Sequence, residues 1–190
     1  MAIGEIFNGT STSNDGSVLG ALDFDGTDDY LTTAVPLQAG ASTYSLEAVF
    51  KTHTQKTQVI WEQNSSSSII GKRVCIILIS TGYGGFNGQS ADFHSSVPYS
   101  TNIRYHWIIT VDTSLGSNKV KIYVNGSLYA QGNPSSTLNA GADVAYIGRK
   151  GTISGEYFDG EIPLVRVYNK VLTASEVLQN YNATKTRFGL

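Results

Sequence analysis

The stretch that decides the fold is Tyr105–Gln131, which reads YHWIITVDTSLGSNKVKIYVNGSLYAQ. In its first part every second residue is aromatic or aliphatic, namely Tyr105, Trp107, Ile109 and Val111. This period of two fits a strand with one buried face and does not fit a helix. A second run alternates in the same way, and its inward positions are Val120, Ile122 and Val124. The sequence therefore predicts two antiparallel strands at the centre of a sheet.

The dipeptide Asn125-Gly126 follows the second strand and predicts a tight hairpin. Both central residues of a type I′ turn need a positive φ, which Asn and Gly adopt readily. A third strand is therefore expected to return along the second. The register that this turn predicts pairs Tyr123 with Leu128 and Ile122 with Tyr129.

The composition fits one all-β domain of 190 residues. Charged residues make up 15% and the net charge is −2, so nucleic acid is not an expected partner. The single cysteine, Cys75, lies in the apolar run VCIILI, which predicts a buried thiol.

No run approaches the roughly 18 apolar residues that a membrane span needs. The first residues, MAIGEIFNGT, lack the features of a signal peptide, so neither membrane insertion nor export is expected.

The composition of successive segments divides the chain into an arm, a domain and a tail. Residues 1–16 are polar and are interpreted as an N-terminal arm, residues 17–184 as the domain, and residues 185–190 as a C-terminal tail. Within the domain, Arg73–Ser80 is apolar on both faces and is predicted to be a central strand. Thr81–Ser100 is rich in glycine and lacks clean alternation, so we expect it to be irregular.

Two further signals lie near the C-terminus. The alternation of Tyr157–Val171 changes phase around Pro163, which predicts a bulge or an edge because proline cannot donate to a sheet. Thr173 and Glu176 form a capping box, which predicts a helix over Ala174–Asn182. Many short strands and one terminal helix predict an all-β fold, a two-sheet antiparallel sandwich.

Five segments, taken in order, resemble a known family. They are ALDFDGTDDYL, WIITVD, VKIYVNGSLYA, YIGR and FDGEIPLVRVYNKVLTASEVLQNY. From Leu19 to Tyr181 the chain resembles a laminin-G-like jelly roll of the concanavalin A-like lectin/glucanase superfamily. The resemblance implies two antiparallel sheets, one of them curved, with the chain ends close together. The ending QNYNATKTRFGL is similar to the endings of structural proteins of marine tailed phages.

A group of aspartates around one predicted turn is the candidate metal site. Calcium prefers oxygen ligands, and the resemblance implies that a structural Ca²⁺ can bind, because some members of the family bind it. The candidate ligands are Asp25, Asp28 and Asp29, with Asp23 nearby. The EF-hand spacing is absent, and Pro163 stands where the family often has an aspartate. We favour the other interpretation, in which Asp25 and Asp28 form Asx turns and no cofactor is bound.

The segment Thr81–Ser100 is the candidate glycan site. Carbohydrate sites need a flat apolar face for the sugar ring and amide or hydroxyl groups for its hydroxyls. This segment supplies both, and its candidate residues are Tyr83, Phe86, Asn87, Phe93, His94 and Tyr99. The alternative, which we favour, is that these aromatic residues cover the core or pack on a neighbouring subunit.

No catalytic pattern is found. Glucanases of this fold carry a Glu-x-Asp-x-(x)-Glu strand, and here Glu47, Glu62 and Glu161 each stand alone. The three histidines lack metal-ligand spacing, and His106 is expected to lie at a strand surface or to hydrogen-bond locally. The sequence therefore predicts no enzyme.

The function predicted from the sequence is that of a non-enzymatic virion structural protein, either a capsid decoration or a fibre component. It would be made in a host cytoplasm and located in the virion. Its expected partners are capsid or other virion proteins, further copies of itself in a homo-oligomer, and a host surface glycan. The first alternative is a carbohydrate-binding lectin-like module, and the second is a degenerate glucanase-like enzyme. The fold alone does not decide among these classes.

Overall fold

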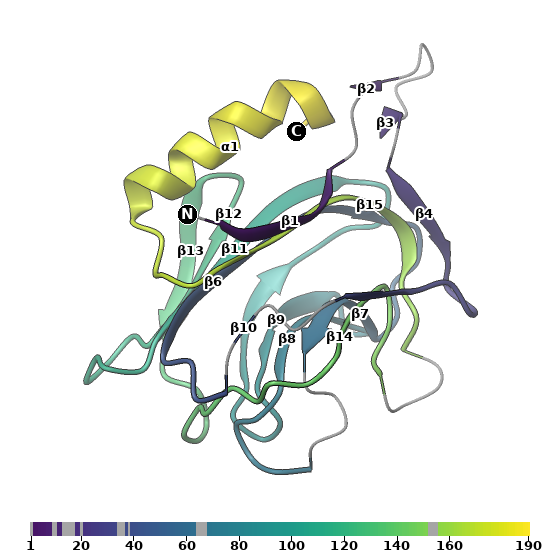
Figure 1. Cartoon of the computed structure of the whole chain (residues 1–190). Coiled ribbons are helices and arrows are strands. Elements are labelled where there is room, and N and C mark those ends of the chain that lie inside the picture. Colours follow the sequence, from purple (N-terminus) through teal and green to yellow (C-terminus); the bar gives the residue numbers. More distant parts are fainter. Residues whose placement is uncertain are drawn as a thin grey trace.

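The computed structural model describes residues 2–8, 11–12, 18–19, 21–33, 37, 39–63, 68–151 and 156–190, with 2–8, 11–12, 18–19 and 95–96 described by their backbone alone. Two antiparallel sheets stack face to face, as Figure 1 shows. One helix follows the last strand in this part of the chain. The arrangement is a jelly-roll sandwich with a C-terminal helix, which confirms the predicted fold class. No described helix is both long enough and apolar enough to cross a membrane.

Seven strands form the larger sheet. Its order is β1 (Ala2–Asn8), β15 (Asp159–Tyr168), β6 (Thr43–Thr52), β11 (Arg104–Asp112), β12 (Val120–Val124) and β13 (Ser127–Gly132), and β4 (Leu22–Asp25) also pairs with β15. The predicted central meander is thus β11, β12 and β13.

Six strands form the smaller sheet. Its order is β10 (Phe93–Pro98), β9 (Tyr83–Asn87), β8 (Val74–Ile79), β7 (Gln58–Gln63), β14 (Ala145–Ile147) and β5 (Leu31–Thr33). The apolar strand β8 lies between β7 and β9, so its prediction as a central strand is confirmed. Two short strands, β2 (Ser11–Thr12) and β3 (Val18–Leu19), pair with each other and form a separate two-stranded sheet.

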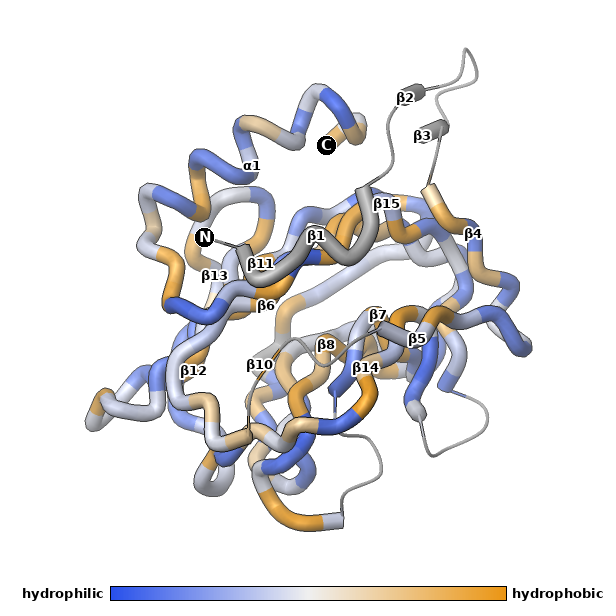
Figure 2. The backbone as a smooth tube through the Cα atoms, viewed as in Figure 1, coloured by the Kyte–Doolittle hydropathy of each residue, from blue (hydrophilic) through white to orange (hydrophobic). Residues whose placement is uncertain are grey.

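The core fills the space between the sheets. Its members from the larger sheet include Trp107, Ile109 and Val111 of β11 and alternate residues of β6, as the period of two predicted. Trp107 meets the Phe50 ring edge-on, with ring centres 5.1 Å apart. Ile76 and Leu78 of β8 contribute from the smaller sheet. Figure 2 shows this as hydrophobic colouring along β7 and β8.

Helix α1 (Ala174–Phe188) covers the outer face of the larger sheet (Figure 1). Its residue Val177 packs into a cluster with Ile108, Tyr123, Tyr168 and Leu172. Both bonds of the capping box are present at Thr173 and Glu176, which confirms the predicted start. The helix runs beyond the predicted end at Asn182, because the buried side chains of Thr184 and Phe188 extend its apolar stripe. Most of the predicted tail 185–190 is therefore the last helical turn, closed by Gly189 at φ 65°.

The hairpin after β12 is confirmed, with one change of register. Asn125 and Gly126 have φ values of 48° and 80°, as a type I′ turn requires. Tyr123 pairs with Leu128 as predicted, but Ile122 pairs with Ala130. The predicted pair of Ile122 with Tyr129 is wrong because Tyr129 is the extra residue of a β-bulge.

Strand β15 changes partners at Pro163. Its register against β6 shifts between Glu161 and Leu164, which confirms the predicted bulge. Residues 159–162 pair with β4, and residues 164–168 pair with β1. A residue without a backbone N–H thus occupies the position at which β15 passes from one neighbour to the other.

Two predicted segments are corrected. Residues 2–8 of the predicted arm form β1 and pair with β15, so they belong to the sandwich rather than to a separate arm. The other arm residues with a described backbone, 11–12, form β2. The predicted irregular segment Thr81–Ser100 contains β9 and β10, which continue the smaller sheet.

Candidate functional site

A row of side chains crosses the outer face of the smaller sheet. The register pairs Tyr146 with Glu62, Glu62 with Cys75, and Cys75 with Asn87, from β14 through β7 and β8 to β9. Residues directly opposite each other in a sheet project from the same face. Since Ala145 and Ile147 on either side of Tyr146 lie in the core, this row faces away from it.

Arg73 ties this row together. It precedes β8 by one residue and lies two residues before Cys75, on the same face. Its Nε lies 2.7 Å from Glu62 Oε1, and its Nη1 donates to Asn87 Oδ1 at 3.3 Å. Asn87 Nδ2 in turn lies 3.4 Å from His94 Nε2. A buried carboxylate is thus linked through a guanidinium and an amide to an exposed imidazole.

Glu62 is the buried end of this row. Burial raises the pKa of its carboxyl to about 7, although the positive charge of Arg73 opposes the rise. The Gly151 backbone N–H also donates to it at 3.3 Å, next to an ion pair between Lys150 and Glu156. The neighbouring Cys75 is buried as predicted, and burial raises the pKa of its thiol well above the ordinary value. The middle of the row is therefore covered, and its ends reach the surface.

The predicted glycan residues divide into two groups. Phe86 and Tyr99 are buried in the core, and the Tyr99 hydroxyl donates to the Ile79 carbonyl at 2.9 Å. Phe93 packs against the same core. These three side chains therefore do not offer a free aromatic face, as the alternative interpretation of the segment predicted. The other predicted residues, Tyr83, Asn87 and His94, reach the surface, and Tyr83 is 44% exposed.

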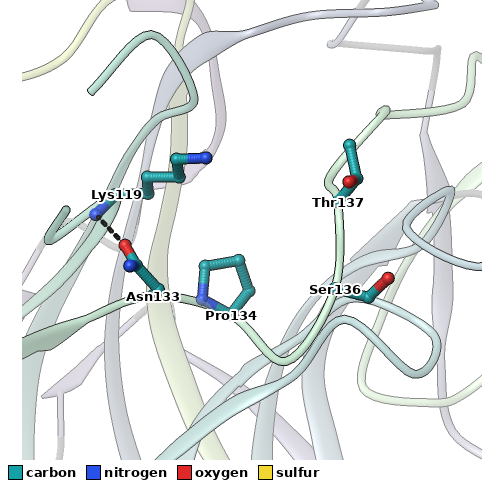
Figure 3. Close-up of a pocket in the computed structure, with 5 residues that line it drawn as sticks. All are labelled: Lys119, Asn133, Pro134, Ser136 and Thr137. Atoms are coloured by element: carbon teal, nitrogen blue, oxygen red, sulfur yellow. Dashed lines mark hydrogen bonds between the residues drawn. The ribbon is translucent and has the colours of Figure 1, made fainter. Parts of the chain in front are cut away.

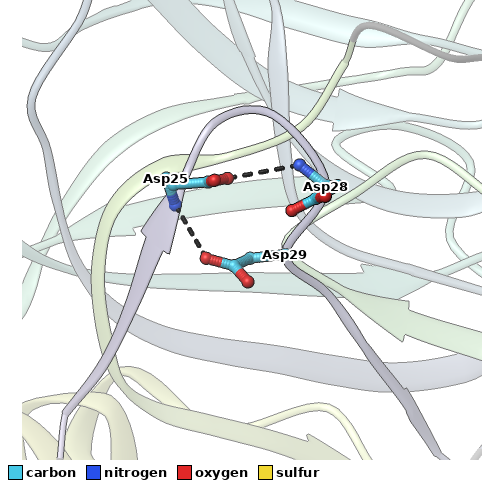
Figure 4. A group of neighbouring side chains, drawn as sticks. All are labelled: Asp25, Asp28 and Asp29. Atoms are coloured by element: carbon cyan, nitrogen blue, oxygen red, sulfur yellow. Dashed lines mark hydrogen bonds between the residues drawn. The ribbon is translucent and has the colours of Figure 1, made fainter.

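The three predicted metal-ligating aspartates do lie together, as Figure 4 shows. Each is exposed, and one ligand atom from each lies within 4.8 Å of the others. Asp25 Oδ1 accepts from the N–H of Thr27 at 2.7 Å and from that of Asp28 at 3.2 Å. Asp29 Oδ2 accepts from the Asp25 N–H at 3.1 Å. The two bonds that Asp25 accepts form an Asx turn, and they lower the pKa of its carboxyl, chiefly through Thr27. The remaining carboxylate oxygens suit a cation, but the turn is hydrogen-bonded without one.

We expect calcium and a chelator to give the same melting temperature, because the Asx turn at Asp25 supplies its own acceptors. Replacing Asp25 with alanine should lower the melting temperature equally in both conditions, since two backbone donors lose their acceptor. Asp25→Asn keeps the acceptor oxygen and is the matched control, expected to melt close to the parent. Thermal melts check this. A rise with calcium that Asp25→Asn abolishes would instead establish a structural metal site.

Two hollows lie elsewhere on the surface. One of about 270 Å³ is lined by Lys119, Asn133, Pro134, Ser136 and Thr137 at the end of β12 and β13 (Figure 3). No aromatic ring of the described residues lines this hollow, and its side chains are mostly polar. Asn133 Oδ1 accepts from the Lys119 N–H at 3.4 Å. The other, of about 110 Å³, lies beside the aspartate turn and is lined by residues that include Asp29 and Tyr30.

Sequence reasoning missed two groups of residues. On the smaller sheet, Arg149 lies against the rings of Tyr30 and Tyr146. Under α1, His106 is buried and contacts Glu47 at 2.9 Å. Its predicted place at a strand surface is therefore wrong, and it does have a hydrogen-bonding partner, but one that lies 59 residues away in the chain. Both groups join residues far apart in the chain. The one signal in the sequence was the segment YIGR, which places Tyr146 and Arg149 three residues apart and is one of the segments that resemble the family.

Comparison with solved structures shows the same fold in several proteins. A Bacteroides ovatus protein with a proposed carbohydrate-binding role matches with a TM-score of 0.64 and 21% identity, over 84% of this chain and 46% of that one. A Trypanosoma rangeli sialidase in complex with sialic acid matches with a TM-score of 0.65 and 17% identity, over 92% and 29%. A heptameric pentraxin from Limulus polyphemus matches with a TM-score of 0.56 and 16% identity, over 82% and 78%.

These likenesses establish the fold. The chain spans less than half of the first two of those proteins. No curated protein matches the sequence significantly. The comparisons give no support to the resemblance to tailed-phage proteins. A family model matches residues 25–178, which is most of the predicted domain 17–184. The chain therefore belongs to the concanavalin A-like lectin/glucanases superfamily, the family that its motifs resemble.

Proposed function

We propose that this domain binds carbohydrate, without catalysis, at the surface end of the polar row on the smaller sheet. The observation that carries the proposal is the chain of contacts from Glu62 through Arg73 and Asn87 to His94. It fixes an amide and an imidazole at the surface from neighbouring strands. Groups held in place before binding lose little freedom when a ligand arrives.

Tyr83 supplies the apolar element of this site. It pairs with Ile79 on β8, and four residues further along the same register Asn87 pairs with Cys75. Tyr83 and Asn87 therefore project from the same face of β9. Four residues of a strand span about 13 Å. An exposed ring at that distance from an amide and an imidazole, on the same face, offers both kinds of contact that a short sugar chain needs.

The placement of the buried carboxylates supports a role without catalysis. Glycoside hydrolysis commonly needs two carboxyl groups that flank one bond, about 5–5.5 Å apart in retaining enzymes. Glu62 lies on the outer face of the smaller sheet. Glu47 lies on the outer face of the larger sheet, where it contacts Asn180 of α1. The core separates these two carboxylates, so they do not form such a pair.

A glycan array followed by calorimetry of the best ligand tests the proposal. Asn87→Ala should weaken binding about tenfold, because it removes a positioned hydrogen-bonding group. Tyr83→Ala should weaken binding as well, through loss of the stacking face. Tyr129→Ala is the matched control, since Tyr129 is 53% exposed but lies on β13 of the other sheet. An array on which the parent protein binds no glycan would refute the proposal.

The virion location, the capsid partners and the homo-oligomer stay predictions from the sequence. They depend on the missing signal-peptide features, the polar N-terminal segment and the similarity of the chain ending to phage proteins, and the comparisons give them no support. We therefore rank carbohydrate binding, the first alternative of the sequence-based interpretation, above a virion role.

A further inference from the structure

Arg149 lies in an unusual position on the smaller sheet. Its guanidinium carbon is 3.8 Å from the ring centre of Tyr30 and 4.7 Å from that of Tyr146. The two ring centres are 6.2 Å apart, with an angle of 55° between the ring planes. The guanidinium thus packs against two aromatic rings that belong to different parts of the chain. Stacking of this kind fixes the orientation of its planar set of donors.

The charge of Arg149 is not neutralised by any acidic side chain in the described part of the chain. Its one hydrogen bond there runs from Nη2 to the Gly151 carbonyl at 3.2 Å. The adjacent Lys150 is paired with Glu156. The Nε of Arg149 is buried without a partner in that part of the chain, so the two terminal nitrogens, Nη1 and Nη2, carry the donors left for a ligand.

The aspartate turn, which contains Asp25, Asp28 and Asp29, directly precedes Tyr30 in the chain. Two of its carboxylates, Asp25 and Asp29, accept backbone N–H groups within the turn. All three are exposed, so salt screens their charges, with a screening length of about 8 Å at physiological ionic strength. The turn therefore weakens the positive potential at Arg149 without occupying its donors.

We propose that Arg149, Tyr30 and Tyr146 form a subsite for the carboxylate group of an acidic sugar. A carboxylate accepts two parallel N–H donors from one guanidinium, a geometry that a sugar hydroxyl cannot match. Tyr30 is 42% exposed and offers apolar surface to the ring that bears the carboxylate. This inference rests on the proposed function and extends it, because it names a carboxylated sugar as the class of ligand. The subsite lies at the β14 end of the polar row, three strands from Asn87 on β9, so it is a second contact point on the same face of the sheet.

Paired sugars that differ only in the carboxylate test the subsite. The probes are the methyl glycosides of glucose and glucuronic acid and of galactose and galacturonic acid, titrated into the isotope-labelled protein and followed by NMR. An acidic member of a pair should bind roughly ten- to hundredfold more tightly than its neutral partner. Acetate, which has the carboxylate but no ring, should bind more weakly than the acidic sugars.

Variants assign the effect to Arg149. Arg149→Gln should bring the acidic sugar to the affinity of its neutral partner, and Arg149→Lys should give an intermediate value, because it keeps the charge without the paired donors. Arg187→Gln is the matched control, since Arg187 also lies over an aromatic ring, that of Phe188, on α1. Equal binding of both members of each pair, or acidic-sugar binding that survives Arg149→Gln, would overturn the subsite and leave carbohydrate binding intact. Absence of binding by every sugar here and on the array would overturn both proposals.

Discussion

Replacing Trp107 with alanine is expected to lower the free energy of unfolding by about 3–5 kcal/mol, as for other large aromatic residues removed from a core. Trp107 is fully buried on β11, the strand at the centre of the larger sheet. Its ring packs against Phe50 and reaches across the core to β9, where a Cβ atom on Gly84 would lie only 2.7 Å from it. The variant therefore leaves a cavity between the two sheets.

Thermal and denaturant unfolding check this prediction. For a domain of this size, 1 kcal/mol shifts the melting temperature by about 2–4 °C, so the variant should melt roughly 6 °C or more below the parent. Tyr129→Ala, an exposed aromatic truncation on β13, is the control and should change stability by less than about 0.5 kcal/mol. A Trp107→Ala protein that melted with the parent would mean that Trp107 does not join the two sheets.

The parts of this fold that were predicted correctly are those set by neighbours in the chain. The alternation of Trp107 and Ile109, the turn at Asn125-Gly126 and the capping box of Thr173 each depend on a few consecutive residues. Their structures match the prediction because local geometry and burial of one face agree.

The strands β9 and β10 were missed for a physical reason. Glycines in a sequence usually indicate a loop, but here they permit close packing. A Cβ atom on Gly85 would lie 2.5 Å from the Phe93 carbonyl oxygen of β10. Glycine is also found in strands where another backbone approaches closely. Since that approach depends on the folded partner, no local pattern in Thr81–Ser100 could reveal it.

The candidate sites were missed in part because they join distant residues. Arg73 and Asn87 are 14 residues apart, and Asn180 reaches Glu47 across 133 residues. A single charged residue within a strand gives no sign of its partner. Glu47 and Glu62 therefore looked alike in the sequence, although one is bound beneath a helix and the other lies in the polar row.

Glu47 is the second residue for which a large effect is expected, because it holds α1 to the sheet. Its carboxylate accepts from His106 Nε2 at 2.9 Å, from Asn180 Nδ2 at 3.0 Å and from the Tyr168 hydroxyl. The Arg166 guanidinium lies 3.4 Å away. Since Asn180 belongs to α1 and the others to the sheet, this one buried carboxylate joins the two elements.

Glu47→Ala is expected to lower the free energy of unfolding by about 3–5 kcal/mol, as when one member of a buried ion pair is removed. His106 and Tyr168 would be left buried without their acceptor. Glu47→Gln keeps the volume and one acceptor oxygen and should lie between the parent and the alanine variant. Denaturant unfolding measures the three free energies. Equal stability of all three proteins would show that the carboxylate contributes nothing to the attachment of α1.

The pH dependence of this effect has a definite sign. Burial alone raises the pKa of Glu47, but the hydrogen bond and charge of His106, with help from Tyr168 and Arg166, bring it below its ordinary value of 4.5. A carboxyl whose pKa is lowered by folding binds its proton more readily in the unfolded chain. Its stabilisation is therefore complete above pH 4.5 and is lost as the pH falls further.

The difference in stability between the parent and Glu47→Gln should accordingly be largest near neutral pH and shrink as the pH falls below 4.5. Subtracting the two profiles removes the contribution of other carboxyl groups with lowered pKa, such as that of Glu161. Hydrogen exchange of the α1 amides should speed up with Glu47→Gln before that of β11, because the helix depends directly on this contact. A stability difference that stays constant to acid pH would mean that folding does not lower the pKa of Glu47, and one that grows toward acid pH would mean that the native carboxyl is protonated. Either result would overturn the ionic attachment of α1.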